Sequence, residues 1–408
     1  MEIIYERCCG MDIHKELIVA CVMKGGKKET EIKSFGTMTD DLLQMCAWLK
    51  ERQVQMVAME STGSYWKPIF NILEIEEIPA ILVNAADVKN LPGRKTDVKD
   101  SEWLADLLKH GLLKPSFVPK RDMRELRELV RYRKSIIEER AREYNRIDKV
   151  LQGANIKLTN VASKNDTKSG MDMVRAIING EMNSEVLASM AKGTMKSKTD
   201  ELKRAMNGYI QPHQQMILKA MVNHIDILTE SIETLDNEIE RRMAEEADMI
   251  EMLDGITGVG TRTAQVILAE IGTDMSQFPT AENLASWACM CPGKNQSAGR
   301  KKKEKTRKNK NILKSSLIQA GRSAGNSKDT YLHSQYARIA ARRGANRAAV
   351  AVGHSILIIC YHMIKNRTAY EDLGGDFFMK QNKEALLKRH IKRIEELGYK
   401  IELVEVAS

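Results

Sequence analysis

The sequence predicts an α/β domain at the amino-terminal end, followed by long charged helices and a mostly α-helical carboxyl-terminal region. Three observations predict this fold class. In about the first 118 residues, short apolar runs alternate with segments of helical periodicity. From Lys120 onward, long charged segments carry apolar residues at heptad-like spacing. The chain has 408 residues, of which 43% are hydrophobic and 29% charged, enough for several packed domains.

The α/β domain is expected over residues 1–118. The runs 17–23, 54–59 and 80–83 are rich in β-branched residues and predict strands. Between the first two, residues 39–52 place apolar side chains at helical spacing, with Thr39 or Asp40 available as the N-cap. Strands that alternate with helices indicate a mixed sheet that is at least partly parallel.

Residues 119–248 are expected to form long coiled-coil helices around an insertion. Each of two segments carries a seam in which the spacing alternates between three and four residues. The first seam comprises Leu126, Val130, Arg133, Ile137, Arg140, Tyr144, Ile147 and Leu151. The second comprises Leu218, Met221, Ile225, Leu228, Ile232, Leu235 and Ile239. The two helices could pair within one chain or between chains, and the pattern does not define the fold of residues 152–200.

Residues 249–375 are expected to form a carboxyl-terminal helical domain, followed by a charged tail over 376–408. The turn 256–260 precedes an apolar helix and is typical of a helix-hairpin-helix element. The backbone N–H groups of Gly258 and Gly260 could face a phosphate, although a plain packing corner would give the same pattern. The apolar stretch 348–363 is interrupted by polar residues and is expected to be too short and too polar to span a bilayer.

Charge and cysteine content restrict the class of partner. Lys and Arg total 64 against 55 for Asp and Glu, so the net charge is +9 and a polyanionic partner is favoured. The seven cysteines form no CxxC pair, which argues against a zinc finger and against a disulfide framework. The amino-terminal residues lack the apolar core of a signal peptide, so we expect a cytoplasmic protein.

Four carboxylates in the first domain have the pattern of a metal site. Asp12 precedes the 17–23 run and Glu60 ends the 54–59 run, while Asp97 and Asp100 lie three residues apart at the start of a helix. Two Mg²⁺ ions held by such acids can stabilise both oxygens of a phosphoryl transfer. Singly, each acid has a structural explanation, since Asp97 could cap the helix and Glu60 could be a polar strand end.

The most basic stretch of the chain spans residues 300–310 and contains eight basic residues and one acid. Such a density of like charge predicts contact with nucleic-acid phosphates rather than a solvated loop. Ser297 lies in the short loop before it, and a lone serine there is by itself typical of a turn. The predicted nucleic-acid contacts are Arg300, Lys301, Lys302, Lys303, Lys305, Arg307, Lys308 and Lys310.

The segments GMDIHK, MESTGSYW, GRKTDVKDSEWLADLLKHGLL and LASWACMCPGKNQSAGRKKKEK together resemble the DEDD transposases of insertion sequences. The resemblance implies a RuvC-like (RNase H-like) first domain and a family-specific carboxyl-terminal domain. It implies that the Mg²⁺-binding acids are Asp12, Glu60, Asp97 and Asp100. It also implies that Ser297 is the nucleophile that joins covalently to the cut DNA strand.

The resemblance further implies partners and an assembly. These are the DNA of the element ends and target, a structured guide (bridge) RNA that pairs with DNA, and a homo-oligomer, dimer or tetramer. The acid domain and the serine domain would act on one phosphate, from one protomer or from two, in a nucleoid-associated complex.

Two other functions remain open at this point. A RuvC-like structure-specific nuclease would cut by water attack and leave Ser297 idle. A non-enzymatic basic coiled-coil protein would scaffold nucleic acid, with the acids as surface charge.

Overall fold

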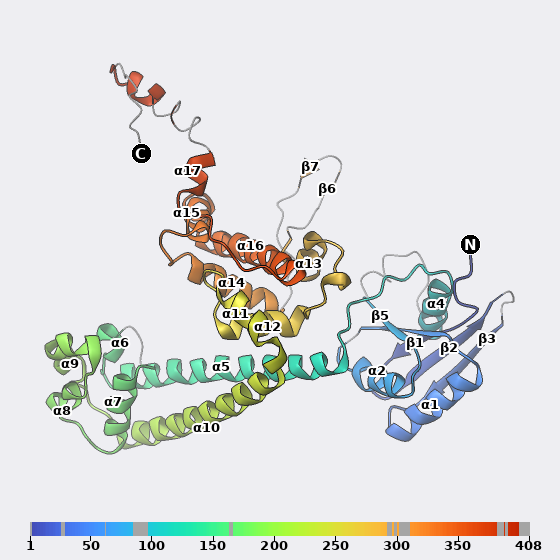
Figure 1. The fold of residues 1–408 in the computed structure, drawn as a ribbon. Coiled ribbons are helices and arrows are strands. Elements are labelled where there is room, and N and C mark those ends of the chain that lie inside the picture. Colours follow the sequence, from blue (N-terminus) through green and yellow to red (C-terminus); the bar gives the residue numbers. More distant parts are fainter. Residues whose placement is uncertain are drawn as a thin grey trace. The chain divides into compact units, whose positions relative to one another are not determined.

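The computed structural model describes residues 2–25, 29–61, 63–84, 97–162, 166–291, 296–297, 300–301, 311–381, 387 and 391–399. The chain divides into two compact units, Met1–Arg124 and Glu125–Ser408 (Figure 1). The finer predicted boundaries at residues 118, 248 and 375 stay a prediction.

The first unit is built on a five-stranded mixed sheet, which confirms the α/β prediction. Its strands lie in the order β3-β2-β1-β4-β5. They are β1 (Arg7–Ile13), β2 (Ile18–Lys24), β3 (Thr30–Phe35), β4 (Met56–Glu60) and β5 (Ala80–Val83). The first three strands pair antiparallel, whereas β1, β4 and β5 run parallel.

Helices cover both faces of this sheet (Figure 1). α1 (Thr39–Glu51) and α2 (Trp66–Ile75) lie on one face, and α4 (Asp97–Lys109) lies on the other. Because successive strand residues point to opposite faces, β1 contributes to both cores. Cys9 and Met11 pack with α1 and α2, whereas Cys8 packs with Leu104 and Leu108 of α4.

Gly10 allows α4 to lie directly on β1. A Cβ at this position would lie 2.3 Å from the Ser101 carbonyl oxygen and 2.4 Å from the Ala105 nitrogen, both of them backbone atoms. Cys8, two residues earlier on the same face, donates its thiol to the Ala105 carbonyl at 3.4 Å. No side chain larger than hydrogen fits without moving the helix.

We therefore expect Gly10→Ala to destabilise the first unit by about 3 kcal/mol, because overpacking against backbone atoms cannot be relieved by a rotamer change. Scanning calorimetry of the full chain measures this as a lower unfolding temperature for that unit. Gly153→Ala is the matched control, since its added Cβ would meet nothing closer than Gln214 Nε2 at 3.7 Å. Equal unfolding temperatures for Gly10→Ala and the wild type would contradict the close contact of α4 with β1.

The second unit begins with an antiparallel helix pair, α5 (Arg121–Gly153, whose first turn belongs to the first unit) and α10 (Pro212–Arg242). The two helices lie side by side within one chain (Figure 1). Their contacts run in opposite directions along the two sequences, from Arg133–Asp236 to Arg140–Thr229 to Glu143–His224. The pairing is therefore intramolecular, and the supercoiling of a coiled coil stays a prediction.

The predicted seams are partly wrong in register. On α5, Ile136 and Glu143 are buried where Ile137 and Tyr144 were expected, and on α10 Val222 is buried in place of Met221. An α-helix has 3.6 residues per turn, so a strict 3.5-residue pattern drifts around the helix over several turns. The other apolar positions of both seams are buried or partly buried.

Short helices pack at the far end of this pair, where the sequence defined no fold. They are α6 (Leu158–Val161), α7 (Lys168–Ile178), α8 (Ser184–Ser189), the 3₁₀ helix Gly193–Lys198 and α9 (Thr199–Ala205). They share one hydrophobic core with Ile147 and Leu151 of α5 and Leu218 and Ile225 of α10.

The remainder of the second unit is mostly helical, as predicted, with one two-stranded hairpin of β6 (Gln296–Ser297) and β7 (Arg300–Lys301). Its helices are α11 (Ala247–Asp254), α12 (Thr261–Ile271), α13 (Ala281–Trp287), α14 (Ile312–Ala324), α15 (Tyr331–Arg343), α16 (Ala345–Asn366) and α17 (Phe377–Gln381), with 3₁₀ turns at Ala244–Glu246 and Met275–Gln277. α14 and α16 cross with their backbones in close contact at two glycines. A Cβ at Gly321 would lie 2.5 Å from the Ala349 carbonyl oxygen, and one at Gly353 would lie 2.6 Å from that of Leu317.

α16 is longer than the apolar stretch predicted from the sequence. Among the described residues it is the helix that is long and apolar enough, by length and composition, to cross a membrane, so the expectation that the stretch is too short and too polar is wrong. More than half of its apolar window is buried within the protein, at residues that include Val352, Ile356 and Leu357. This burial against α14 is that of a core helix.

Candidate active site and nucleic-acid interface

Asp12 and Glu60 lie next to each other at the carboxyl ends of β1 and β4. The parallel register pairs Gly10 with Ala58 and Met11 with Met59, so the following residues of both strands are neighbours. Asp12 shares the sheet face of Gly10, which is the face that α4 covers. The Asp12 side chain is 19% exposed and Glu60 is half-buried, so both positions are partly shielded from water.

The first turn of α4 approaches the same edge of the sheet. On β1, Cys8 contacts Ala105 of α4, and Gly10, two residues later, lies closest to Ser101, four residues earlier on the helix. The helix therefore runs opposite to β1, and its amino-terminal turn, residues 97–100, lies towards Asp12. Asp97 is the helical position one turn before the buried Ser101, and Asp100 is exposed.

The described side chains stop short of a complete metal site. Among the residues that the structure describes, no group of three or more His, Cys, Asp or Glu side chains is close enough to hold a metal ion. The side chain of Asp97 lies outside the described atoms, as do residues 85–96 before it. The fold thus brings Asp12 beside Glu60 and directs α4 towards them. The donor chemistry, carboxylate oxygens alone, fits Mg²⁺.

Sequence reasoning missed His14. Its Nε2 lies 3.1 Å from Asp12 Oδ2, on the turn that joins β1 to β2 and is closed by the His14 N–H donating to the Leu17 carbonyl at 2.9 Å. The contact fixes one oxygen of the carboxylate. The available signal was spacing, since His14 follows Asp12 by two residues at a strand end.

Ser297 lies in a short hairpin rather than in an irregular loop. β6 (Gln296–Ser297) pairs antiparallel with β7 (Arg300–Lys301), and Ser297 is opposite Arg300. The structure therefore places one predicted phosphate contact directly across from the predicted nucleophile. Lys301, a second predicted contact, lies opposite Gln296 in the same hairpin. The remaining predicted contacts of the basic segment lie outside the described residues, namely Lys302, Lys303, Lys305, Arg307, Lys308 and Lys310.

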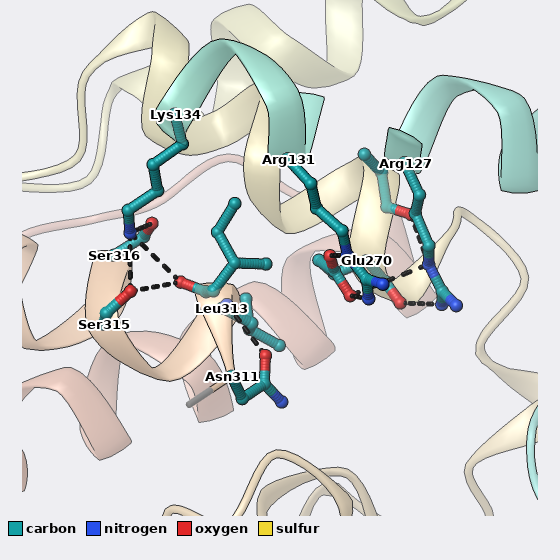
Figure 2. Close-up of polar contacts among 10 residues, drawn as sticks. Arg127, Arg131, Lys134, Glu270, Asn311, Leu313, Ser315 and Ser316 are labelled. Atoms are coloured by element: carbon teal, nitrogen blue, oxygen red, sulfur yellow. Dashed lines mark hydrogen bonds and ion pairs between the residues drawn. The ribbon is translucent and has the colours of Figure 1, made fainter. Parts of the chain in front are cut away.

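The helix that follows the basic segment is held by α5 (Figure 2). Asn311 caps α14 by accepting a hydrogen bond from the Leu313 N–H at 2.9 Å. Lys134 of α5 donates to Ser315 Oγ at 2.5 Å and to Ser316 Oγ at 3.0 Å. Burial lowers the pKa of Lys134. The first turn of α14 is therefore fixed to a helix far away in the sequence.

A second anchor joins α5 to the carboxyl end of α12 (Figure 2). Arg131 forms a bidentate ion pair with Glu270, at 2.7 and 2.8 Å, and Glu270 is 1% exposed. Arg127 donates to the Ala269 carbonyl at 2.9 Å, and burial lowers the pKa of Arg127 to about 10. Cations at the carboxyl end of a helix also complement its dipole. Together the two anchors fix the helices on either side of residues 272–310.

The glycine turn before α12 is at least a packing corner. Gly258 has φ +88°, and a Cβ there would lie 2.5 Å from the Ala320 carbonyl oxygen of α14. Gly260 precedes α12 and has open space around it. Asp254, however, accepts a hydrogen bond from Thr261 Oγ1 at 3.1 Å, which puts an acid at the amino end of α12 where it disfavours a second anion. The phosphate contact of Gly258 and Gly260 stays a prediction.

Two family models match the chain. Residues 9–156 match a transposase model of the DEDD type found in IS110 elements, and residues 250–337 match one described as the transposase IS116/IS110/IS902 family. The matches together cover more than half of the chain and include the positions of all five predicted catalytic residues. The protein is therefore a transposase, an enzyme that acts on DNA. Within that class it belongs to the IS110 family of DEDD transposases. No curated protein matches the chain.

Proposed function

We propose that this transposase cuts and exchanges DNA strands with a Mg²⁺-dependent carboxylate site in the first unit and with Ser297 as nucleophile. The observation that carries the proposal is the arrangement of β1, β4 and α4. In it, Asp12, Glu60 and the first turn of α4 approach one edge and one face of the sheet.

In this proposal, Asp12, Glu60, Asp97 and Asp100 hold the metal. Bound Mg²⁺ stabilises negative charge on the phosphate oxygens and favours loss of a proton from an attacking hydroxyl. The acids would fix the position of the metal and, through it, that of the scissile phosphate. The contact of His14 orients the carboxylate of Asp12.

The chemical step is a phosphoryl transfer. Ser297 Oγ forms a bond to the scissile phosphorus as the phosphorus–oxygen bond to the leaving DNA strand breaks. The serine hydroxyl loses its proton and the leaving oxygen gains one, so charge and atoms balance. Attack by a hydroxyl of a second DNA strand then releases the serine and completes the exchange.

We also propose that a structured guide RNA binds this protein and selects its DNA sites, within a homo-oligomer in the cytoplasm. The net charge of +9 and the resemblance of the sequence support an RNA partner. Sequencing the RNA that co-purifies with the protein tests this part. Recovery of an unselected mixture of cellular RNA would contradict a dedicated guide.

One experiment separates the proposed reaction from its alternatives. End-labelled DNA is incubated with the protein, Mg²⁺ and any co-purified RNA, then resolved on a denaturing gel. Label that migrates with the protein supports serine attack. Free ends bearing a 5′-phosphate, without adduct, indicate hydrolysis by water and would overturn the nucleophile. Binding without cleavage would overturn the enzymatic proposal altogether.

The basic segment should contact phosphates rather than bases. Each phosphate neutralised contributes about 0.9 to the slope of log K against log salt for duplex DNA. Changing Lys301, Lys302 and Lys303 together to Ala should flatten that slope by about two to three units and weaken binding to all sequences alike. Fluorescence anisotropy across a salt series measures both quantities. An unchanged slope would mean that these lysines are solvated.

A further inference from the structure

Five arginines gather where α14, α15 and α16 meet. Arg342 and Arg343 end α15, and Arg347 lies in the first turn of α16, on the other side of the Gly344 turn. Arg338 lies one helical turn before Arg342, and Arg322 of α14 donates to Asn346 Oδ1 at 2.9 Å. All five side chains are exposed. We call this group, Arg322, Arg338, Arg342, Arg343 and Arg347, the arginine corner.

The crossing of two helices explains why Arg322 belongs to this corner. Gly321 and Gly353 let the backbones of α14 and α16 approach closely, with the α14 glycine facing Ala349. Arg322, the next residue, is thereby carried to the amino-terminal turn of α16. Arg338 is held by its own contact, with its guanidinium 4.1 Å from the ring centroid of Phe378. The charges thus come from three helices with fixed relative positions.

The charge at the corner is not neutralised within the described part of the chain. None of the five arginines forms an ion pair with a described carboxylate, whereas the arginines of α5 and α10 do so repeatedly, as Arg131, Arg133 and Arg242 show. From Thr330 to Tyr370 the sequence contains six Lys or Arg residues and no Asp or Glu. Like charges at this density raise the local potential unless an external anion binds.

Stabilisation of the helix dipole explains the arginines that end α15 but not the arginine that begins α16. Arg342 and Arg343 lie in the last turn of α15, where a cation complements the helix dipole. Arg347 lies in the first turn of α16, where the dipole disfavours a cation and where no acid is present. A bound anion would remove this conflict, because it would face Arg347 and the amino end of α16 together.

We propose that the arginine corner binds the phosphate backbone of duplex DNA, as a second contact distinct from the basic segment 300–310. The inference rests on the DNA-directed function proposed above. Guanidinium groups bind phosphate oxygens in a bidentate manner, and exposed arginines on three helices can contact several phosphates of one duplex at once. Contacts of this kind fix the position of the duplex and carry no sequence information.

The test is binding of fluorescein-labelled duplex DNA of arbitrary sequence, measured by anisotropy over a salt series in EDTA so that no cleavage occurs. Arg343→Gln/Arg347→Gln is expected to flatten the salt slope by about two units and to weaken binding about 30-fold near 0.15 M salt. Arg343→Lys/Arg347→Lys keeps both charges and should keep the slope. Arg241→Gln/Arg242→Gln removes the same charge from residues paired with Glu238 and should leave the slope unchanged.

The outcomes are decisive in either direction. An unchanged slope in Arg343→Gln/Arg347→Gln, with circular dichroism and melting temperature as in the wild type, overturns the proposal. So does a loss confined to a structured RNA probe measured in parallel, which would assign the corner to RNA. Equal loss in the Arg241→Gln/Arg242→Gln control would show that net charge alone is responsible. A wild type that binds no duplex DNA would instead refute the proposed function, and the arginine corner with it.

Discussion

The Ser297→Ala variant is expected to bind DNA and Mg²⁺ like the wild type and to form no covalent adduct. If Ser297 Oγ attacks the scissile phosphate, removing it leaves no atom for the protein–DNA bond, and strand exchange should fall by at least about 10³-fold. The measurement uses end-labelled DNA, Mg²⁺ and co-purified RNA, and scores label that migrates with denatured protein. Ser297→Cys retains a nucleophile and should keep a residual amount of adduct. That amount should be smaller with Mg²⁺ than with a softer metal ion, because a thiolate is a soft ligand.

An equal adduct in Ser297→Ala and the wild type would contradict the assignment and point to another serine of α14. The structure ranks the candidates. Ser316 is 6% exposed, while Ser315 is exposed and accepts a hydrogen bond from Lys134 at 2.5 Å. Ser315→Ala would then be the next variant, with Ser323→Ala after it. Loss of adduct in Ser315→Ala, with Ser297→Ala active, would move the nucleophile to α14.

Much of the first unit could be predicted from the sequence because its apolar runs have a clear period. The strand runs 17–23, 54–59 and 80–83 correspond to β2, β4 and β5, and the helix expected over 39–52 is α1. Each of these elements has a buried face lined by apolar residues, and that burial produces the pattern in the sequence. The elements predicted from the sequence period are therefore those in which apolar residues occupy the buried face.

The sequence did not predict strands β1 and β3, and the reason differs between the two. β1 has the sequence RCCGMDI, in which Gly10 has weak strand propensity and is required by the backbone of α4, a tertiary contact. β3 is exposed at every residue except Phe35, so it shows no buried stripe. Neither strand could be recognised from its local sequence, although β1 carries Asp12.

The candidate site was predictable in residue type and only partly in contacts. The position of Glu60 at the end of a strand run was predictable, whereas Asp12 was expected before the 17–23 run and lies in β1, the strand that was missed. The anchoring of α14 by Lys134 joins residues about 180 positions apart, and the arginine corner depends on the crossing of α14 and α16 at two glycines. Such contacts follow from packing between distant segments, which a single sequence does not encode in its periodicity.

Asp12→Asn is expected to reduce DNA cleavage by at least about 10³-fold while DNA binding is retained. The substitution keeps the shape of the side chain and removes the negative charge that would hold Mg²⁺ beside Glu60. Glu60→Gln, Asp97→Asn and Asp100→Asn should behave alike, because a site for two metal ions needs most of its carboxylates. Cleavage of labelled DNA measures the activity. Titration with Mn²⁺, followed by electron paramagnetic resonance, measures metal binding independently of cleavage.

Asp106→Asn is the matched control for the residues of α4. Asp106 lies on the same helix, away from its first turn, with Oδ1 3.7 Å from His110 Nε2, and 48% of its side chain is exposed. It carries the same charge and is also accessible to solvent, so general effects of charge or helix stability appear in both variants. Loss of Mn²⁺ binding and of cleavage in Asp100→Asn but not in Asp106→Asn would place the metal at the amino-terminal turn of α4. Wild-type cleavage in both Asp97→Asn and Asp100→Asn would remove α4 from the metal site. The proximity of Asp12 and Glu60 would then be only a consequence of the strand pairing.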